Sequence, residues 1–348
     1  MTPGFSISVV IPTWNGLHLL RENLPSVLTA VEFYRARSGA AVEILVVDDG
    51  STDTTVQDLP DEFPQVKLII RPRNGGFAKA CNTGFKASRH SLVALLNNDV
   101  DLDPEYLLHM ASHFEDEDVF AVTAKVYEWD STTFTTGGRY GRFRRGFWSV
   151  YFNYDIPCDA AAWIDGRKLF SAYAIGGFAT YHREKLQRLD GFNELLSPFH
   201  WEDVDLSYRG WKRGWKIHYE PRSTARHRTS ATIDAHYRKK HVDAVSFRNR
   251  LLFHWINLHS PSFLIRHLLM LLVLTATRVV ALDFYFYRSL YEAILKLPEV
   301  LSYRAAERKA LRRSDTEVAR MLTGFYGAAP IEVYFSQREV LERHPEAQ

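Results

Sequence analysis

The chain has 348 residues, of which 46% are hydrophobic and 14% aromatic, so it can bury a large core and is not a disordered protein. Its 43 Lys and Arg residues nearly balance its 41 Asp and Glu residues, and the net charge of +2 excludes a global field that attracts nucleic acid. The two cysteines, Cys81 and Cys158, lack metal-type spacing, which argues against a zinc site or a disulfide framework and favours a reducing, cytoplasmic compartment. The first residues show no secretory signal pattern.

Four short apolar runs in the first hundred residues are each typical of a buried strand. They are SISVVIP, VEILVVDD, VKLIIRP and SLVALLNND, at residues 6–12, 42–49, 66–72 and 91–99. Amphipathic or small-residue stretches at 17–36, 51–57 and 77–87 separate them and predict helices. Strands that alternate with helices predict an α/β fold with a largely parallel sheet covered on both faces.

Polar residues follow the carboxyl ends of these four strands, where doubly wound sheets bind their ligands. They are Pro12, Thr13 and Asn15 after the first strand, Asp48 and Asp49 after the second, Arg71, Arg73 and Asn74 after the third, and Asp99 and Asp101 after the fourth. Acidic residues and glycines also end strands for structural reasons alone, but four such ends together favour one shared crevice. In that crevice either Asp48 or Asp49 can accept a hydrogen bond from a ribose or a base, and either Arg71 or Arg73 can meet phosphate oxygens.

The run LLNNDVDLDP, residues 95–104, places Asp99, Asp101 and Asp103 at alternate positions. In an extended segment their carboxylates share a face and repel one another unless a cation lies between them. Two carboxylates one residue apart suit a hard divalent ion that also binds phosphate oxygens, so Mg²⁺ or Mn²⁺ and a nucleotide diphosphate are predicted here. Asp103 precedes Pro104 and fits a helix cap better than a metal ligand.

The segments SVVIPTWNG, VEILVVDDGSTD, NGGFAKACNTG and LLNNDVDLDP, in this order, resemble the motifs of inverting family 2 glycosyltransferases of the GT-A fold. The resemblance implies a Rossmann-like mixed sheet flanked by helices, and a dTDP-, UDP- or GDP-linked sugar donor held by a metal on Asp99 and Asp101. The residues assigned to the nucleotide sugar are Pro12, Thr13, Asn15, Asp48, Asp49, Arg73, Asn74, Gly76, Asn98, Asp99 and Gly177. The T-W-N-G opening and an arginine-rich middle segment look like bacterial rhamnosyltransferases of cell-surface polysaccharide synthesis.

Residues 174–221 resemble the later motif of the same family, which ends in W-E-D-V-D-L at the start of a helix. Matched by position, Asp203 is the general base that takes the proton of the acceptor hydroxyl, and Glu202 and Trp201 shape the acceptor site. Asp205 is the competing base, although on a helix it lies one turn from Arg209, which favours an ion pair.

Two further segments are assigned by their place in the motif order or by composition. His227 matches the histidine that in many family members completes the metal or diphosphate site. Residues 137–155, GGRYGRFRRGFWSVYFNYD, mix basic and aromatic side chains, and we predict an acceptor loop with Arg145 as a contact; a solvated β-hairpin is the alternative.

The C-terminal third is predicted to be helical at 236–257, across the apolar residues 263–297, and at 315–326. The apolar core between His267 and Arg278 is shorter than the roughly 20 residues of a spanning helix, and Arg278 and Asp283 would each cost about 3 kcal/mol at the bilayer centre. The helices therefore either pack on the catalytic domain or lie in the membrane interface. We predict a catalytic domain at 1–235, divided near 126 into nucleotide and acceptor halves, and a helical region at 236–348 that is peripheral at the inner face of the cell membrane.

The predicted function is transfer of a hexosyl or rhamnosyl unit from a nucleotide sugar to a hydroxyl of a lipid-linked or polysaccharide acceptor, by one inverting displacement. The alternative from another class is a catalytically silent relative that acts as a carbohydrate-binding or assembly subunit. Glycoside hydrolysis also uses two carboxylates, but it needs no nucleotide crevice.

Overall fold

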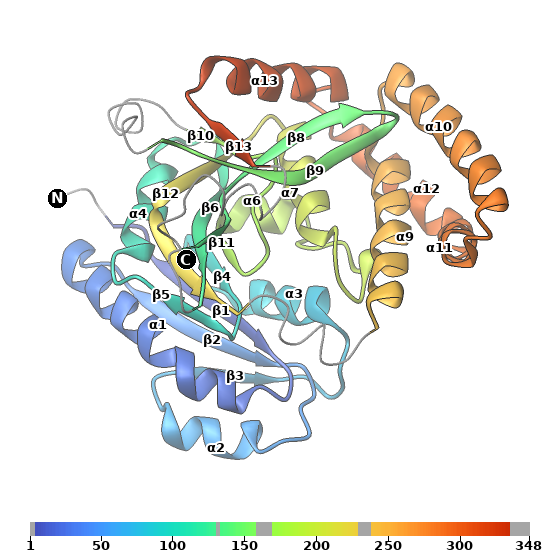
Figure 1. Cartoon of the computed structure of the whole chain (residues 1–348). Helices are drawn as coiled ribbons and strands as arrows, with labels where there is room; N and C mark the ends of the chain where they lie inside the picture. Colours follow the sequence, from blue (N-terminus) through green and yellow to red (C-terminus); the bar gives the residue numbers. More distant parts are fainter. Residues whose placement is uncertain (1–3, 130–132, 158–168, 229–237, 335–348) are drawn as a thin grey trace.

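The chain is described by a computed structural model at residues 4–129, 133–157, 169–228 and 238–334 (Figure 1). Cys158 and the predicted domain boundary at residue 235 lie outside these residues. A ten-stranded mixed sheet crosses the molecule in the order β10-β12-β6-β11-β4-β1-β2-β3, with β5 beside β12 and β7 beside β6.

The first half contains the predicted alternation of strands and helices. The strands are β1 (Ile7–Thr13), β2 (Val42–Asp48), β3 (Lys67–Ile70) and β4 (Leu92–Leu96), and the helices are α1 (Leu17–Ser38), α2 (Thr55–Glu62) and α3 (Phe77–Ala87). β1 pairs in parallel with β2 and β4, and β2 pairs in parallel with β3, so all four carboxyl ends meet at one edge. The predicted strand positions are therefore confirmed to within a few residues.

The second half turns the sheet into a mixed one. Its elements are β5 (Val100–Leu102), α4 (Tyr106–Ser112), β6 (Val119–Glu128), β7 (Phe134–Thr136), β10 (Leu169–Phe170), β11 (Phe178–His182), α6 (Arg183–Arg188), α7 (Glu202–Lys212) and β12 (Lys216–His227). β11 is antiparallel to both β4 and β6. β12 continues past a register shift after Glu220 to pair with β5, which carries His227 to the strand ends.

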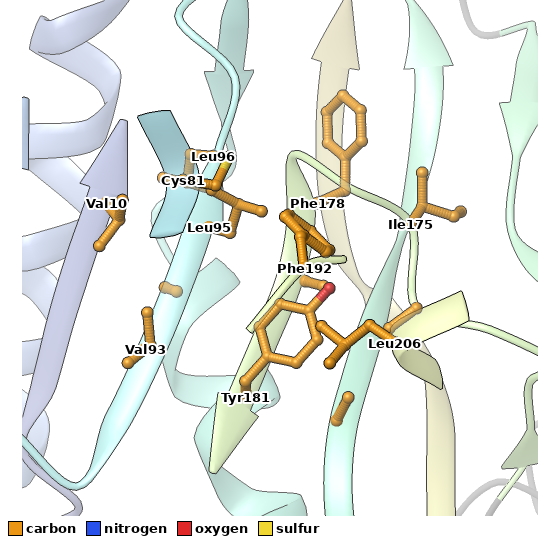
Figure 2. Packing of buried hydrophobic residues seen from close by; sticks show 14 of the residues in the cluster. Val10, Cys81, Val93, Leu95, Leu96, Ile175, Phe178, Tyr181, Phe192 and Leu206 are labelled. Carbon is orange, nitrogen blue, oxygen red and sulfur yellow. The ribbon is translucent and has the colours of Figure 1, made fainter. Parts of the chain in front are cut away.

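The core between sheet and helices is built from fully buried residues of β1, β4 and β11 (Figure 2). Val10 and Val93 lie on neighbouring strands, and Tyr181 of β11 lies in the same cluster. Gly84 lets α3 approach β1, because a Cβ at this position would lie 2.3 Å from Val10 Cγ1. Close packing of α3 fixes the glycine-rich loop that precedes it.

The arginine-rich segment is a β-hairpin, the alternative that the sequence left open. Its strands are β8 (Gly138–Arg144) and β9 (Phe147–Asp155), which pair antiparallel, and β13 (Glu332–Tyr334) adds a third strand. Arg145 and Gly146 both have positive φ, 47° and 77°, as a tight two-residue turn requires. The hairpin is not freely solvated, since Trp148 and Tyr154 are fully buried.

Five helices follow: α9 (Lys239–Asn257), α10 (Pro261–Val280), α11 (Phe284–Leu295), α12 (Leu297–Lys309), which was not predicted, and α13 (Asp315–Ala328). Leu252 of α9 and Val318 of α13 belong to the same buried cluster as the strands. Asp315 at the start of α13 pairs with Lys212 of α7 and accepts from Tyr208 Oη at 2.8 Å. The helical region is thus joined to the sheet by apolar packing and by a buried ion pair.

Two buried histidines attach the hairpin to α9 and α10. The amide of Trp148 donates to His254 Nε2 at 2.7 Å, and His267 Nδ1 donates to the carbonyl of Gly146 at 2.9 Å. Trp255 Nε1 donates to His267 Nε2 at 3.2 Å, and the two imidazoles stack with centroids 4.8 Å apart. Burial lowers the pKa of both rings, to about 4 for His267, so both are neutral at physiological pH.

We expect acid to weaken this attachment. The pKa of His267 is below the value of about 6.5 for an unfolded histidine, so the unfolded state binds more protons, and stability is complete above pH 6.5 and falls as the pH decreases toward 4. Between about pH 7 and pH 5, His267 should contribute a loss of about 2 kcal/mol in the free energy of unfolding. Urea unfolding of wild type and His267→Gln at both pH values measures this difference. An equal pH dependence in the two proteins would contradict the assignment.

Candidate active site

Side-chain hydrogen bonds join the end of β1 to the neighbouring strand ends. Asn98 Nδ2, after β4, donates to Thr13 Oγ1 at 2.9 Å, next to Pro12 in the ladder. Asn15, with φ of 50°, accepts at Oδ1 from the amide of Thr52 at 2.7 Å. The predicted residues of this strand end therefore lie together, and Asn15 organises the loop after β2.

Asp49 organises the loop after β3. Its carboxylate accepts from Arg71 Nη1 at 2.6 Å and from the amides of Gly75 and Gly76, the latter at 2.8 Å. Asn74 Oδ1 also accepts from the amide of Gly76 at 3.0 Å. Burial raises the pKa of Asp49, and the amides and Arg71 oppose that rise. The predicted cluster of residues 71–76 is thus held by one carboxylate.

Asp48 differs from Asp49 in having an unused oxygen. Its Oδ2 accepts from the amides of Gly50 and Ser51 at 3.2 and 3.1 Å, while Oδ1 is buried with no hydrogen-bond partner among the described residues. Gly50 lies so close to the backbone of Arg73 that a Cβ would be 2.6 Å from the Arg73 carbonyl carbon. Asp48 Oδ1 can therefore accept from a ligand, whereas Asp49 is satisfied by the protein.

The acidic run does not form the single face that was predicted. Asp99 lies in a turn before β5 and approaches His227 Nε2 at 3.2 Å, whereas Asp101 lies within β5 and approaches Arg226 at 3.7 Å. His227 and Arg226 are successive residues of β12, and their side chains point to opposite faces of the sheet. The carboxylates of Asp99 and Asp101 therefore lie on opposite faces as well. Asp103 accepts from the amide of Glu105 at 2.9 Å in the turn before α4, as a capping residue.

No group of three or more His, Cys, Asp or Glu side chains within the described ranges is arranged to hold a metal. Asp99 and His227 nevertheless give one carboxylate and one imidazole at the strand ends. A divalent ion that takes its remaining ligands from diphosphate oxygens and water fits such a pair. Asp101, which was predicted as a ligand, is placed beside Arg226 instead.

Gly176 and Gly177 bring the second half of the chain to the edge where the parallel strands end. Gly177, with φ of 95°, lies so close to Asn97 that a Cβ would be 2.3 Å from Asn97 Oδ1. The amide of Gly176 donates to Asp203 Oδ2 at 3.1 Å, and Asp203 Oδ1 accepts from the amide of Val204 at 2.7 Å. The start of α7 is therefore held directly beside the end of β4.

The three acids of α7 have different environments. Asp205 is fully buried and pairs with Arg209 Nε at 2.7 Å and with Asn257 Nδ2 at 2.7 Å, which gives it a structural partner set. Burial, and then the charge of Asp203, raise the pKa of Glu202 to about 8, and its Oε2 has no hydrogen-bond partner in the described part of the chain. Burial also raises the pKa of Asp203, but the amides of Gly176 and Val204 oppose the rise. At neutral pH burial and the charge of Asp203 therefore favour the protonated form of Glu202.

The predicted acceptor residues are not together. Trp201 is buried and packs its ring 5.2 Å from Phe253 and 6.2 Å from Tyr151. Arg145 lies instead in the hairpin turn, where it lines a hollow of about 300 Å³ with residues of α10 such as Arg266. Arg145 is consequently a neighbour of α10 and not of Trp201.

The structure places near the start of α7 two arginines that were not predicted as site residues. The guanidinium of Arg250 lies 5.8 Å from the ring centre of Trp201, and that of Arg139 lies 5.0 Å from the ring centre of Tyr173. The charge of Arg139 lowers the pKa of Asp203. Arg250 could have been found from the sequence because it lies among the apolar residues of α9. An arginine that is shielded from water usually has an acidic partner or a ligand.

This arrangement is an α/β fold with carboxylates gathered at the strand ends. Residues 8–189, just over half of the chain, match the family model of glycosyl transferase family 2, and the chain belongs to this family. A dolichol-phosphate mannosyltransferase of Pyrococcus furiosus is 35% identical over 104 residues, which are 29% of this chain and 28% of that protein. The chain thus spans only a minor part of the length of the curated relatives it matches.

Solved structures show the same fold. GalNAc-T7 with UDP, GalNAc and Mn²⁺ superposes with a TM-score of 0.57 at 17% identity over 73% of this chain and 49% of that one. Staphylococcus aureus TarS 1-349 in complex with UDP-GlcNAc gives a TM-score of 0.51 at 18% identity over 92% of this chain and 91% of that one. The fold is that of the GT-A glycosyltransferases, with a helical C-terminal region.

The protonation of Glu202 can be tested through stability. Its folded pKa of about 8 exceeds the unfolded value, so its contribution is present at low pH and is lost as the pH rises from about 4.5 through 8. Glu202→Gln mimics the neutral acid, and we expect it to be more stable than wild type by at least about 1 kcal/mol at pH 8.5, with a smaller gain at pH 5. Urea unfolding at the two pH values gives both numbers. A gain that is independent of pH would show that Glu202 is ionised in the folded protein.

Proposed function

We propose that the protein transfers a sugar from a nucleotide diphosphate to an acceptor hydroxyl by a single inverting displacement, with Asp203 as the general base. The observation that carries this proposal is the Asp203 carboxylate, which the amides of Gly176 and Val204 hold at the strand ends beside the neutral Glu202. A carboxylate that two amides orient can accept a proton as the new bond forms. The family membership and the fold support this activity over the silent-subunit alternative.

The nucleotide sugar binds across the ends of β1, β2 and β4. Asp48 Oδ1 accepts a hydrogen bond from the nucleoside, since it is the buried carboxylate oxygen with no partner there. The loop that Asp49 holds covers the nucleotide from the side of β3. The UDP in the GalNAc-T7 structure and the UDP-GlcNAc in the TarS structure support a nucleotide-linked donor of this kind. The assignment of the transferred sugar as a hexosyl or rhamnosyl group rests on the sequence resemblance alone.

Asp99 and His227 would hold a divalent cation, Mn²⁺ or Mg²⁺, against the diphosphate. Bound there, the ion supplies positive charge for the departing nucleoside diphosphate. The Mn²⁺ in the GalNAc-T7 structure supports this choice. Asp203 then takes the acceptor proton, and Glu202, which is neutral, adds no negative charge that would repel the incoming hydroxyl oxygen.

The acceptor is lipid-linked or a polysaccharide, and the protein works at a membrane surface. The succinoglycan biosynthesis protein ExoO of Rhizobium meliloti, 39% identical over 88 residues, supports a role in polysaccharide synthesis, and the Pyrococcus furiosus relative is named for a lipid phosphate. α10 is long and apolar enough to cross a membrane by length and composition, and only 6% of its most apolar window is buried in the protein. A helix of that kind needs another apolar environment.

The orientation of α10 favours the membrane interface over a span. Its inward side includes Phe263 and the fully buried His267, which binds the hairpin turn. Its outward side is an apolar stripe at helical spacing, made of Ile265, Leu268, Leu269, Leu272 and Val273, and the adjoining turn and α11 expose Leu282, Phe284, Tyr291 and Leu295. Residues 239–297 contain eight Lys and Arg against three Asp and Glu. This combination suits an anionic lipid surface, with α10 lying in its plane.

The catalytic proposal predicts different losses for three variants. In a thermal-shift panel of UDP, dTDP, GDP, CDP and ADP with and without Mn²⁺, one nucleotide should stabilise wild type in a metal-dependent way. Asp99→Ala should lose that shift, and Asp101→Ala should retain more of it because Asp101 lies beside Arg226. Asp203→Asn should keep the shift but release nucleoside diphosphate from the matching sugar nucleotide at least about 100-fold more slowly. The absence of any nucleotide shift in folded wild type would favour the silent subunit.

The membrane proposal predicts flotation with vesicles. Wild type should float with phosphatidylglycerol vesicles and much less with phosphatidylcholine vesicles. The double variant Leu269→Glu, Leu272→Glu should partition at least about tenfold more weakly, because each leucine contributes about 1.5–3 kcal/mol when buried in lipid. Ile70→Glu is the matched control, since Ile70 is 56% exposed on β3 and away from the stripe. Equal flotation of the double variant, or a dimer that this variant dissociates, would contradict the proposal.

A further inference from the structure

A cation without a counter-charge, Arg250, lies beside Trp201, two residues before the proposed base. Among the described residues, no carboxylate lies within ion-pair distance of Arg250, and its Nε is buried without a hydrogen-bond partner. Burial lowers the pKa of Arg250, which shows that its surroundings disfavour the charge. The neighbouring arginine of α9, Arg248, differs in this respect because it approaches Glu292 at 3.6 Å.

Three aromatic rings surround this guanidinium. Its carbon lies 4.3 Å from the ring centre of Phe147, 5.3 Å from Tyr151 and 5.8 Å from Trp201. Tyr151 is 56% exposed, so the group of rings is open to solvent on one side. Aromatic faces stabilise a guanidinium, but they supply no hydrogen-bond acceptor for its N–H groups.

A second arginine on the same side is also unmatched by acid. Arg139 of β8 donates to Asn153 Oδ1 at 2.5 Å, and its Nε is buried without a partner. Its charge acts on both Tyr173 and Asp203. Arg139 thus acts on the base from the hairpin, and Arg250 of α9 lies against Trp201, two residues before the base. The described residues provide no acid that pairs with either arginine.

We propose that these residues form an acceptor subsite for an anionic carbohydrate, in which Arg250 binds a phosphate or carboxylate group and Tyr151 stacks on a sugar ring. The inference rests on the proposed transferase function, because it concerns the acceptor that Asp203 deprotonates. An anion satisfies the buried guanidinium with charge-assisted hydrogen bonds, and the exposed face of Tyr151 leaves room for the ring beside it. A neutral acceptor would leave Arg250 desolvated and unpaired.

Binding of glucose 6-phosphate, glucuronate and glucose, measured by calorimetry and saturation-transfer NMR, tests the subsite. The first probe carries a phosphate, the second a carboxylate, and the third no charge, so the panel also separates the two anions. Wild type should bind at least one anionic probe about tenfold or more tightly than glucose. Arg250→Gln should remove that preference, and Arg250→Lys should retain part of it. Arg144→Gln, an exposed arginine of the same hairpin, is the matched control and should bind as wild type does.

The result is separable from the transferase proposal. The nucleotide thermal shift of Arg250→Gln reports on the donor crevice and on folding, and it should equal that of wild type. If Arg250→Gln does not fold, Tyr151→Ala replaces it, since Tyr151 is largely exposed, and this variant should weaken binding of the anionic probe. Equal affinity of wild type for glucose and both anions, or unchanged anion binding in the folded Arg250→Gln or Tyr151→Ala variant, would overturn the subsite even where nucleotide binding is intact.

Discussion

The close contact of Gly176 and Gly177 with Asn97 and Asp203 is the constraint on which the site depends. The lack of a side chain at Gly177 lets β11 begin so near the end of β4, because a Cβ there would lie 2.3 Å from Asn97 Oδ1, and the Gly176 amide binds the Asp203 carboxylate at 3.1 Å. This contact places the start of α7 against the edge where four parallel strands end. The residues proposed to bind the donor and the acceptor, which are far apart in the sequence, are thereby held at one edge of the sheet.

The arrangement of charge at this edge depends on which carboxylates accept hydrogen bonds from other groups of the protein. Asp49 and Asp205 have their charges and hydrogen bonds satisfied within the protein. Asp49 pairs with Arg71 and accepts from two glycine amides, and Asp205 pairs with Arg209 and accepts from an asparagine. Asp48 and Glu202 each keep a buried oxygen without a partner in the described residues, and burial raises the pKa of Glu202 enough to hold a proton. Satisfied carboxylates build the loops, and incompletely satisfied ones face the places where ligands are proposed to bind.

The first half of the fold could be predicted because each of its strands is marked by a pattern of neighbouring residues in the sequence. Each of its strands is an apolar run closed by an acid, a proline or an asparagine, and parallel pairing then brings the ends together without further assumptions. The separation of Asp99 from Asp101 could not be predicted in this way, since it depends on the register of β5 against the distant β12. Arg250 was missed for the same reason: its helix was predicted, but the rings around it come from β9 and from the residue that precedes α7. α12 was missed because it is rich in charge and buries only Val300 fully.

The C-terminal helices have two kinds of apolar surface, one buried in the core and one exposed on α10. Leu252 of α9 and Val318 of α13 lie in the same core as the sheet, so their hydrophobic character is explained by folding. α10 is apolar on both sides, and only the side that carries Phe263 and His267 is used by the protein. His267 holds the turn of the hairpin whose other end carries Arg139, and Tyr151 of β9 contacts the ring of Trp201. A lipid surface bound to the outer side of α10 would therefore lie against the same hairpin that forms one wall of the proposed acceptor subsite, and an anionic acceptor bound there would be next to that surface.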